Sequence, residues 1–114
     1  MPFINSKVNV PISDAQQDEI SQGLIAAAND ALGKGESWVM LGFEDNCRLY
    51  FRGDKDTPTA YLEVSIFGGE NKSAFNAFTA KACDVINSVL GVPKDRIYVK
   101  YHAVSSWGWN GGNF

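Results

Sequence analysis

The chain has 114 residues, of which 45% are hydrophobic and 20% are charged, and its formal net charge is −3 at pH 7. This length predicts one domain over residues 1–114. The balance of hydrophobic and charged residues is typical of a soluble globular protein. A net negative charge without any basic run argues against a nucleic-acid partner, and no apolar stretch approaches the ~20 residues that span a membrane.

The first predicted elements are a strand over Phe3–Val8 and a helix that follows it. Ser13 and Gln16 form a capping box, in which each side chain satisfies a free backbone amide of the other residue. Gly33 is a natural left-handed end for this helix. The apolar residues between these signals recur at helical spacing: Ile20, Leu24, Ala27, Ala28, Ala31 and Leu32.

Two strands are expected before the second helix, at Trp38–Phe43 and Ala60–Phe67. A weaker strand near Cys47–Phe51 follows the turn at residues 44–46. The second helix has its own apolar stripe: Phe75, Phe78, Ala82, Val85, Ile86 and Val89.

The second helix should end at Gly91, since Pro93 prevents its continuation. The last predicted strand is Arg96–His102. Gly33 and Gly91 are 58 residues apart, and the same offset superposes apolar positions and turn signals along two pseudo-repeats, about residues 2–52 and 60–110.

The repeat predicts an α/β fold (α+β in some schemes) built from two β-α-β units. Each crossover should be right-handed with parallel strands. The two units then join into a four-stranded mixed sheet with two helices on one face.

Strand alternation separates two faces of the predicted sheet. The face expected under the helices is almost wholly apolar: Ile4, Val8, Val39, Leu41, Phe43, Leu62, Val64, Ile66, Ile97, Val99 and Tyr101. The other face mixes aromatic and charged residues: Phe3, Asn5, Lys7, Trp38, Met40, Tyr61, Glu63, Ser65, Phe67, Tyr98, Lys100 and His102. No remaining helix can cover this second face, so it predicts partner subunits, with a solvated face as the alternative.

The N-terminus is the leading candidate for chemistry. Pro2 follows Met1 directly, so removal of Met1 exposes a secondary amine at the start of a strand. An α-amine ordinarily has a pKa near ~7.7–8.0. Burial and a nearby lysine both lower that pKa, which yields a neutral base near neutral pH.

Other catalytic signals are missing from the sequence. There is no GxSxG motif and no Walker loop, and the only histidine is His102. Cys47 and Cys83 form no metal pattern, so we expect reduced thiols, no metal site and no cofactor. The first residues lack the pattern of a signal peptide, which predicts a cytoplasmic protein, with secretion without a signal peptide as the alternative.

Several motifs together resemble the macrophage migration inhibitory factor family of the tautomerase superfamily. They are Met1-Pro2-Phe3-Ile4, Gly33-Lys34, Asp95-Arg96-Ile97-Tyr98-Val99 and the ending Trp107-Gly108-Trp109-Asn110-Gly111-Gly112-Asn113-Phe114. The resemblance covers the whole chain, including the repeat and the order of elements.

This resemblance implies a homotrimer whose sheets enclose a channel, with an active site at each subunit interface. It also implies a tautomerase, an isomerase that interconverts keto and enol forms of aromatic α-keto acids such as phenylpyruvate, or of dopachrome-like compounds. The substrate would be a small aromatic carboxylate. Some members are secreted cytokine-like signals, so the alternative is a signalling or binding protein with a vestigial pocket and a protein receptor.

The resemblance also implies roles for particular residues. Pro2 matches the catalytic base, and Lys34 matches a lysine that binds the substrate carboxylate or polarises its carbonyl. The alternative for Lys34 is a cation that stabilises the helix end. Tyr98 matches a pocket residue supplied by the adjacent subunit, with ordinary sheet packing as the alternative. Trp38 matches a pocket aromatic residue.

The remaining matches concern the rim of the pocket. Trp109 and Phe114 match rim aromatics, with edge packing nearly as good an interpretation. Phe67 matches a residue that binds substrate through its backbone, with Ile66 as the alternative. Lys100 stands where many members have asparagine, and this second cation predicts stronger attraction for carboxylate substrates.

Two other departures limit what the family implies. The Cys-x-x-Cys motif of animal members is absent, with Thr59 and Leu62 in its place, so thiol–disulfide activity is not expected. His102 stands where an animal member has a channel-lining tyrosine.

Overall fold

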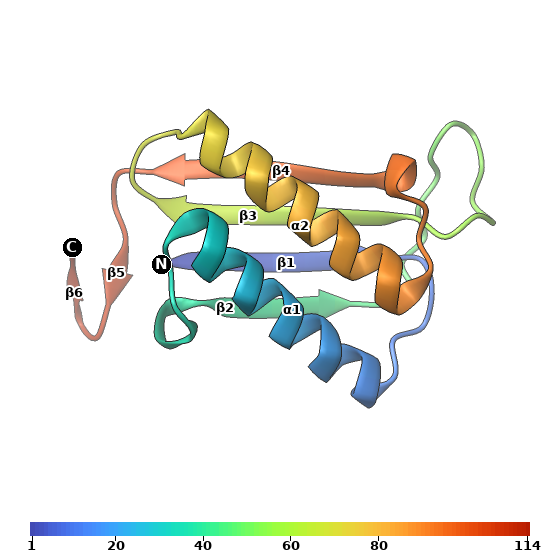
Figure 1. Ribbon diagram of the computed structural model, residues 1–114, viewed down its shortest axis with the longest axis horizontal. Coiled ribbons are helices and arrows are strands. Elements are labelled where there is room, and N and C mark those ends of the chain that lie inside the picture. The colour runs from blue at the N-terminus through green and yellow to red at the C-terminus, as the bar shows by residue number, and fades with distance from the viewer.

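Two strand–helix–strand units follow one another in the computed structural model, which describes residues 1–114. The first comprises β1 (Pro2–Val8), α1 (Asp14–Leu32), η1 (Glu36–Trp38) and β2 (Met40–Glu44). The second comprises β3 (Ala60–Phe67), α2 (Lys72–Leu90), η2 (Lys94–Arg96) and β4 (Ile97–Val104), and a hairpin of β5 (Gly108–Trp109) and β6 (Gly112–Asn113) ends the chain. Figure 1 shows both helices lying across the same face of the sheet.

The sheet has the order β2-β1-β3-β4 and is mixed, as predicted. β1 is parallel to β2 and β3 is parallel to β4, while the two units meet through the antiparallel pair β1 and β3. The units are related by a shift of 58 residues, which carries α1 onto α2 and η1 onto η2 with the same bounds. We call two residues separated by this shift counterparts.

The register of the central pair shows how the units are related in space. Ile4 lies opposite Val64, and Ser6 lies opposite Leu62. Leu62 is the counterpart of Ile4 and Val64 is the counterpart of Ser6, so the 58-residue shift turns one of these pairs into the other. A local twofold axis therefore passes through the pairing of Asn5 with Glu63, its own counterpart.

The helix ends follow the predicted local signals. Gln16 N donates to Ser13 Oγ at 3.1 Å, and Ser13 N donates to Gln16 Oε1 at 3.0 Å, so the capping box is confirmed. Gly33 and Gly91 end the two helices with φ of 65° and 71°, which favour glycine. Asn71 caps the start of α2 by accepting a hydrogen bond from Ala74 N.

The core lies between the helices and the predicted apolar face of the sheet. In β1 and β3 every second residue is buried, beginning with Pro2 and Ala60. Residues of the opposite face, such as Tyr98, are exposed in the isolated chain, with 61% of the Tyr98 side chain accessible. The prediction of one covered and one uncovered face is confirmed.

The prediction of a strand near Cys47–Phe51 is wrong. This segment forms only an isolated bridge between Phe51 and Asp54. Its start is held by hydrogen bonds from Cys47 N to Val8 O and from Asn46 N to Val10 O. These contacts attach a loop to the end of β1 and leave the segment without a strand partner.

Other strand bounds also differ from prediction, by one or two residues. Trp38 and Arg96 belong to η1 and η2, because their amides donate back to Gly35 O and Pro93 O and close a tight turn before each strand. β4 extends past His102 to Val104, since it pairs with all of β3. The C-terminal hairpin was not predicted, because its strands are two residues long.

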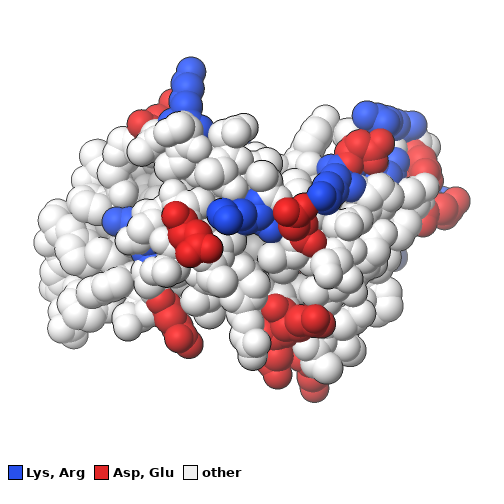
Figure 2. All heavy atoms as spheres, viewed as in Figure 1, with Lys and Arg blue, Asp and Glu red and all other residues white.

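Charged side chains of both signs lie over the helix face (Figure 2), whereas the end that carries the hairpin is largely free of charge. Neither helix is long and apolar enough to cross a membrane.

Candidate active site

A cavity of about 170 Å³ opens beside the N-terminus at the start of β1. Pro2 is fully buried there, opposite Ile66 of β3. Proline suits the first residue of a strand because its missing N–H is not needed for the ladder. We call this cavity the N-terminal pocket; it is lined by Met1, Pro2, Ser37, Trp38, Val39, Met40, Trp107 and Trp109.

The electrostatics of the pocket favour a neutral amine. Partial burial of the Met1 amine lowers its pKa below the ordinary value of 8.0, and the positive charge of Lys34 lowers it further. Lys34 is held at the end of α1, where its backbone amide donates to Ala28 O at 3.2 Å. A terminal amine in this position is therefore better able to accept a proton near neutral pH.

Aromatic side chains form one wall of the pocket. The ring centroids of Trp38 and Trp109 are 5.1 Å apart in an edge-on contact, and Trp109 stacks on Phe114 at 6.2 Å. Phe67 reaches the same group, with its ring 5.7 Å from Phe114. The hairpin that presents Trp109 and Phe114 turns at Asn110, and Phe114 N donates to Trp107 O.

Phe67 and Ile66 were the two alternatives for one pocket position. The side chain of Ile66 is 6% exposed and faces the helices, whereas Phe67 faces the aromatic wall. The side-chain directions favour Phe67 for the pocket position. The backbones of both residues lie at the same end of β3.

Tyr98 and Lys100 lie away from this pocket. Tyr98 pairs with Tyr61 on β3, whereas Pro2 pairs with Ile66. Five strand residues separate those two positions, or about 16 Å at ~3.3 Å per residue. One subunit therefore does not bring Tyr98 to its own Pro2.

Lys100 is exposed in the middle of the uncovered sheet face. It lies opposite Glu63, and with His102 it lines a hollow of about 50 Å³. Of the predicted site residues, one chain gathers Pro2, Lys34, Trp38, Phe67, Trp109 and Phe114 at one end and leaves Tyr98 and Lys100 elsewhere.

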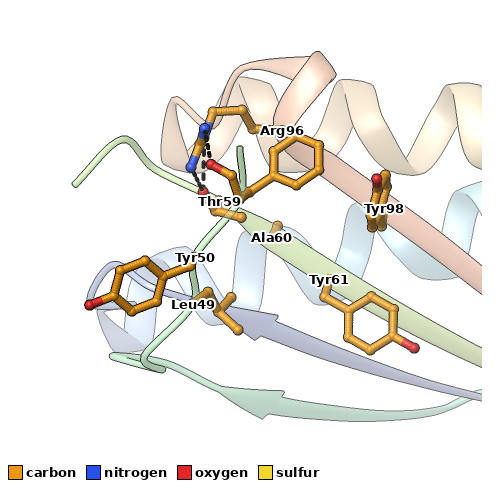
Figure 3. A pocket seen from close by; sticks show the side chains of 8 residues that line it. Leu49, Tyr50, Thr59, Ala60, Tyr61, Arg96 and Tyr98 are labelled. Atoms are coloured by element: carbon orange, nitrogen blue, oxygen red, sulfur yellow. Dashed lines mark hydrogen bonds between the residues drawn. The ribbon is translucent and has the colours of Figure 1, made fainter. Parts of the chain in front are cut away.

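A second cavity of about 290 Å³ lies at the start of β3. We call it the Ala60 pocket (Figure 3); it is lined by Leu49, Tyr50, Phe51, Thr59, Ala60, Tyr61, Arg96 and Tyr98. Most of its members are counterparts of residues in the N-terminal pocket: Ala60 of Pro2, Arg96 of Trp38, Tyr98 of Met40, Leu49 of Trp107 and Phe51 of Trp109.

The sequence prediction missed Trp107 and Met40 in the N-terminal pocket. The repeat contained a signal for Trp107, since the shift of 58 residues carries Leu49 onto it, just as it carries Phe51 onto Trp109. The 58-residue shift therefore relates the loop after β2 to the C-terminal hairpin, although the two segments differ in secondary structure. Among the described residues, no group of three or more His, Cys, Asp or Glu side chains converges to hold a metal ion.

The two β-α-β units form the tautomerase-type fold, which the solved structures most similar in shape share. The model of the family "Macrophage migration inhibitory factor" matches residues 1–114, so the chain belongs to that family.

Individual relatives agree over their whole length. The crystal structure of MIF2 from Leishmania major is 33% identical with a TM-score of 0.94, covering 100% of this chain and 97% of that one. The homologue from Prochlorococcus marinus is 32% identical with a TM-score of 0.88 and 98% coverage of both chains. The macrophage migration inhibitory factor homolog of Trichinella spiralis is 29% identical over 116 residues, covering both sequences fully.

Proposed function

We propose that the chain, once Met1 is removed, is a keto–enol tautomerase of aromatic α-keto acids such as phenylpyruvate, or of dopachrome-like compounds. The observation that carries this proposal is the buried chain terminus beside Lys34. The burial and the positive charge both lower the pKa of the terminal amine. The aromatic wall of Trp38, Trp109 and Phe114 offers a surface for the ring of such a substrate.

Removal of Met1 is required for the chemistry. While Met1 is attached, the Pro2 nitrogen is an amide, which has no basic lone pair. After cleavage it becomes a secondary amine at the end of β1. The two causes that lower the pKa of the Met1 amine then act on the Pro2 amine, which lies deeper in the protein.

The reaction is an internal proton transfer. The neutral Pro2 amine takes a proton from the carbon next to the carbonyl, and the electron pair of that C–H bond moves toward the carbonyl oxygen to give an enolate. The protonated Pro2 amine then gives that proton to the oxygen, which completes the enol and restores the neutral amine, and the reverse steps return the ketone. No oxidant, reductant or cofactor is consumed. Lys34 would bind the carboxylate and stabilise negative charge as the enolate forms.

The site would be completed by a neighbouring subunit in a homotrimer. The support is the uncovered sheet face, on which Tyr98 lies about 16 Å and Lys100 about 10 Å along the strands from the level of Pro2 in their own chain. In this proposal Tyr98 of one subunit packs against substrate held by Pro2 of the next. Lys100 adds a second positive charge to the same composite site.

The test is an enol–keto assay on protein whose mass shows that Met1 is absent. We expect Pro2→Gly to lower kcat by about 10²-fold or more, the lower end of what a positioned acid–base group contributes. Pro11→Gly makes the same exchange at an exposed position and should retain activity. Equal rates for Pro2→Gly and the unsubstituted protein would reject the base role.

A second candidate function is cytokine-like signalling. It is favoured by the exposure of Trp109 (55%) and Phe114 (51%) at the end of the molecule that carries few charges, a surface that a protein receptor could cover. Under this alternative, the Pro2→Gly variant keeps receptor binding, whereas substitution of Trp109 removes it.

A further inference from the structure

Arg96 is a buried arginine whose side chain is fully occupied by a single loop. It is 8% exposed. Nε donates to Pro58 O at 3.3 Å and to Thr59 Oγ1 at 2.9 Å. Nη1 donates to Phe51 O at 3.1 Å, and Nη2 donates to Asp54 O at 2.9 Å and to Thr59 Oγ1 at 2.6 Å. Figure 3 shows the contact between Arg96 and Thr59 at one side of the Ala60 pocket.

The charge of the guanidinium is also matched. Nη1 lies 3.8 Å from Asp54 Oδ2. Hydrogen bonds from Thr57 and from the amide of Asp56 lower the pKa of Asp54 to about 2, so this carboxylate stays ionised at neutral pH. The loop therefore keeps a fixed shape around Arg96.

The residue that this loop presents to the pocket is Phe51. Its backbone exchanges two hydrogen bonds of 3.0 Å with Asp54, and its carbonyl also accepts from Arg96. The Arg96 guanidinium carbon lies 5.3 Å from the centre of the Phe51 ring. Both the backbone and the ring of Phe51 are thus restrained.

Phe51 in turn contacts Tyr98. The ring centroids are 5.0 Å apart with an interplanar angle of 76°, the edge-to-face geometry that aromatic pairs favour. Tyr98 is otherwise 61% exposed on the open sheet face, so the contact with Phe51 restrains a ring that is largely open to solvent.

The counterpart of this arrangement occurs in the N-terminal pocket. There Trp38 stands where Arg96 stands, and it contacts Trp109, the counterpart of Phe51, at 5.1 Å. Both ends of the sheet thus use a residue from the short η helix of one unit to fix an aromatic side chain from the loop or hairpin that follows the last strand of the other unit.

We infer that Arg96, acting through Phe51, is a positioning residue that sets the orientation of Tyr98 before substrate binds. This inference rests on the proposed function, in which Tyr98 completes the neighbouring site. A preset ring loses less side-chain entropy on binding, so the arrangement should act on KM rather than on kcat.

The primary test is Phe51→Leu, because this variant keeps an apolar side chain and leaves all five guanidinium hydrogen bonds in place. We expect KM to rise about two- to tenfold, the range of an edge-to-face pair, with kcat close to that of the unsubstituted protein. Arg96→Lys should act in the same direction, since an ammonium cannot reach the same set of acceptors. Arg48→Lys exchanges an exposed arginine of the same loop and should have no effect.

A double-mutant cycle separates positioning from a general loss of stability. In a Tyr98→Ala background Phe51→Leu should add nothing further to KM, because the ring it orients is gone. Additive effects, or an unchanged KM in Phe51→Leu protein that keeps its oligomeric state, would overturn the inference.

A spectroscopic readout does not depend on activity. With 3-fluorotyrosine incorporated, Tyr98→Phe assigns the Tyr98 resonance among the four tyrosines. Phe51→Leu should move that ¹⁹F resonance toward the value of a free tyrosine, whereas Arg48→Lys should not. An unmoved resonance contradicts the inference, while equal rates for Pro2→Gly contradict only the proposed function.

Discussion

Ser6 and Val64 are counterparts in the two halves of the chain, and both side chains face the helices from the central strands. Ser6 is 1% exposed, and its hydroxyl has no hydrogen-bond partner. A buried polar group without a partner destabilises the folded state. The second half of the chain shows that an apolar side chain is accommodated at this position.

Replacing Ser6 by alanine should therefore stabilise the protein. We expect the free energy of unfolding to rise by about 1 kcal/mol, because the unpaired hydroxyl is removed. Urea denaturation at fixed protomer concentration measures this. Ser13→Ala is the matched control: it removes the same atom from the N-cap of α1 and should lower stability by about 1 kcal/mol. A loss of stability in Ser6→Ala would mean that its hydroxyl is satisfied.

The glycines that end the two helices allow a paired comparison. At both Gly33 and Gly91 a Cβ would meet nothing within 4 Å, so alanine costs only backbone strain at positive φ. Each substitution should lower the free energy of unfolding by about 1 kcal/mol. Only Gly33→Ala should also lower kcat/KM, because Lys34 follows it directly. Equal loss of activity in both variants would argue against a role for the position of Lys34.

Lys34 should control the pH dependence of the reaction. In the proposed mechanism the active form of the Pro2 amine is the neutral one, so activity should be lost as the pH falls through its pKa. The charge of Lys34 lowers the pKa of the terminal amine, and Lys34→Met should therefore raise it. The acid limb of kcat/KM should move to higher pH. Lys72→Met, at an exposed position on α2, should leave the limb in place. A limb that stays fixed in Lys34→Met would show that another group sets it.

Lys100 should contribute to binding of the negatively charged substrate carboxylate. We expect Lys100→Asn to raise KM for an aromatic α-keto acid by about two- to fivefold, the effect of an exposed charge pair. The effect should shrink as ionic strength increases. KM for the methyl ester of the same acid should not change. No change in KM for the acid itself would exclude Lys100 from the substrate site.

Local signals in the sequence were sufficient to predict most of the fold. The capping box at Ser13 and the glycines at 33 and 91 set the helix ends through contacts within a few residues. The alternation of apolar residues determined which face of each strand is covered, since burial in β1 and β3 has a strict period of two.

The parts that were not predicted depend on distant contacts. The segment after Cys47 is shaped by Val8 and by Arg96, which is 49 residues further on. The strand propensity of this segment cannot reveal that the carbonyl of Phe51 already accepts a hydrogen bond from Arg96. Likewise, Tyr98 belongs to the proposed site only through a second subunit. Its distance from Pro2 of the same chain gives no sign of that role.

The local twofold axis makes it a chemical difference whether the two halves are separate chains or one chain. Two separate half-length chains would each begin with an ionisable amine. If their first strands paired in the way β1 pairs with β3, one amine would lie at each end of the sheet. Joining the halves turns the second amine into the peptide nitrogen of Ala60, which is 2% exposed within a continuous strand. Under the proposed function, that end therefore has no amine for proton transfer. Arg96 stands there in the place that Trp38 has beside Pro2, and it holds the loop of Phe51 against Tyr98 instead of lining a pocket with a terminal amine.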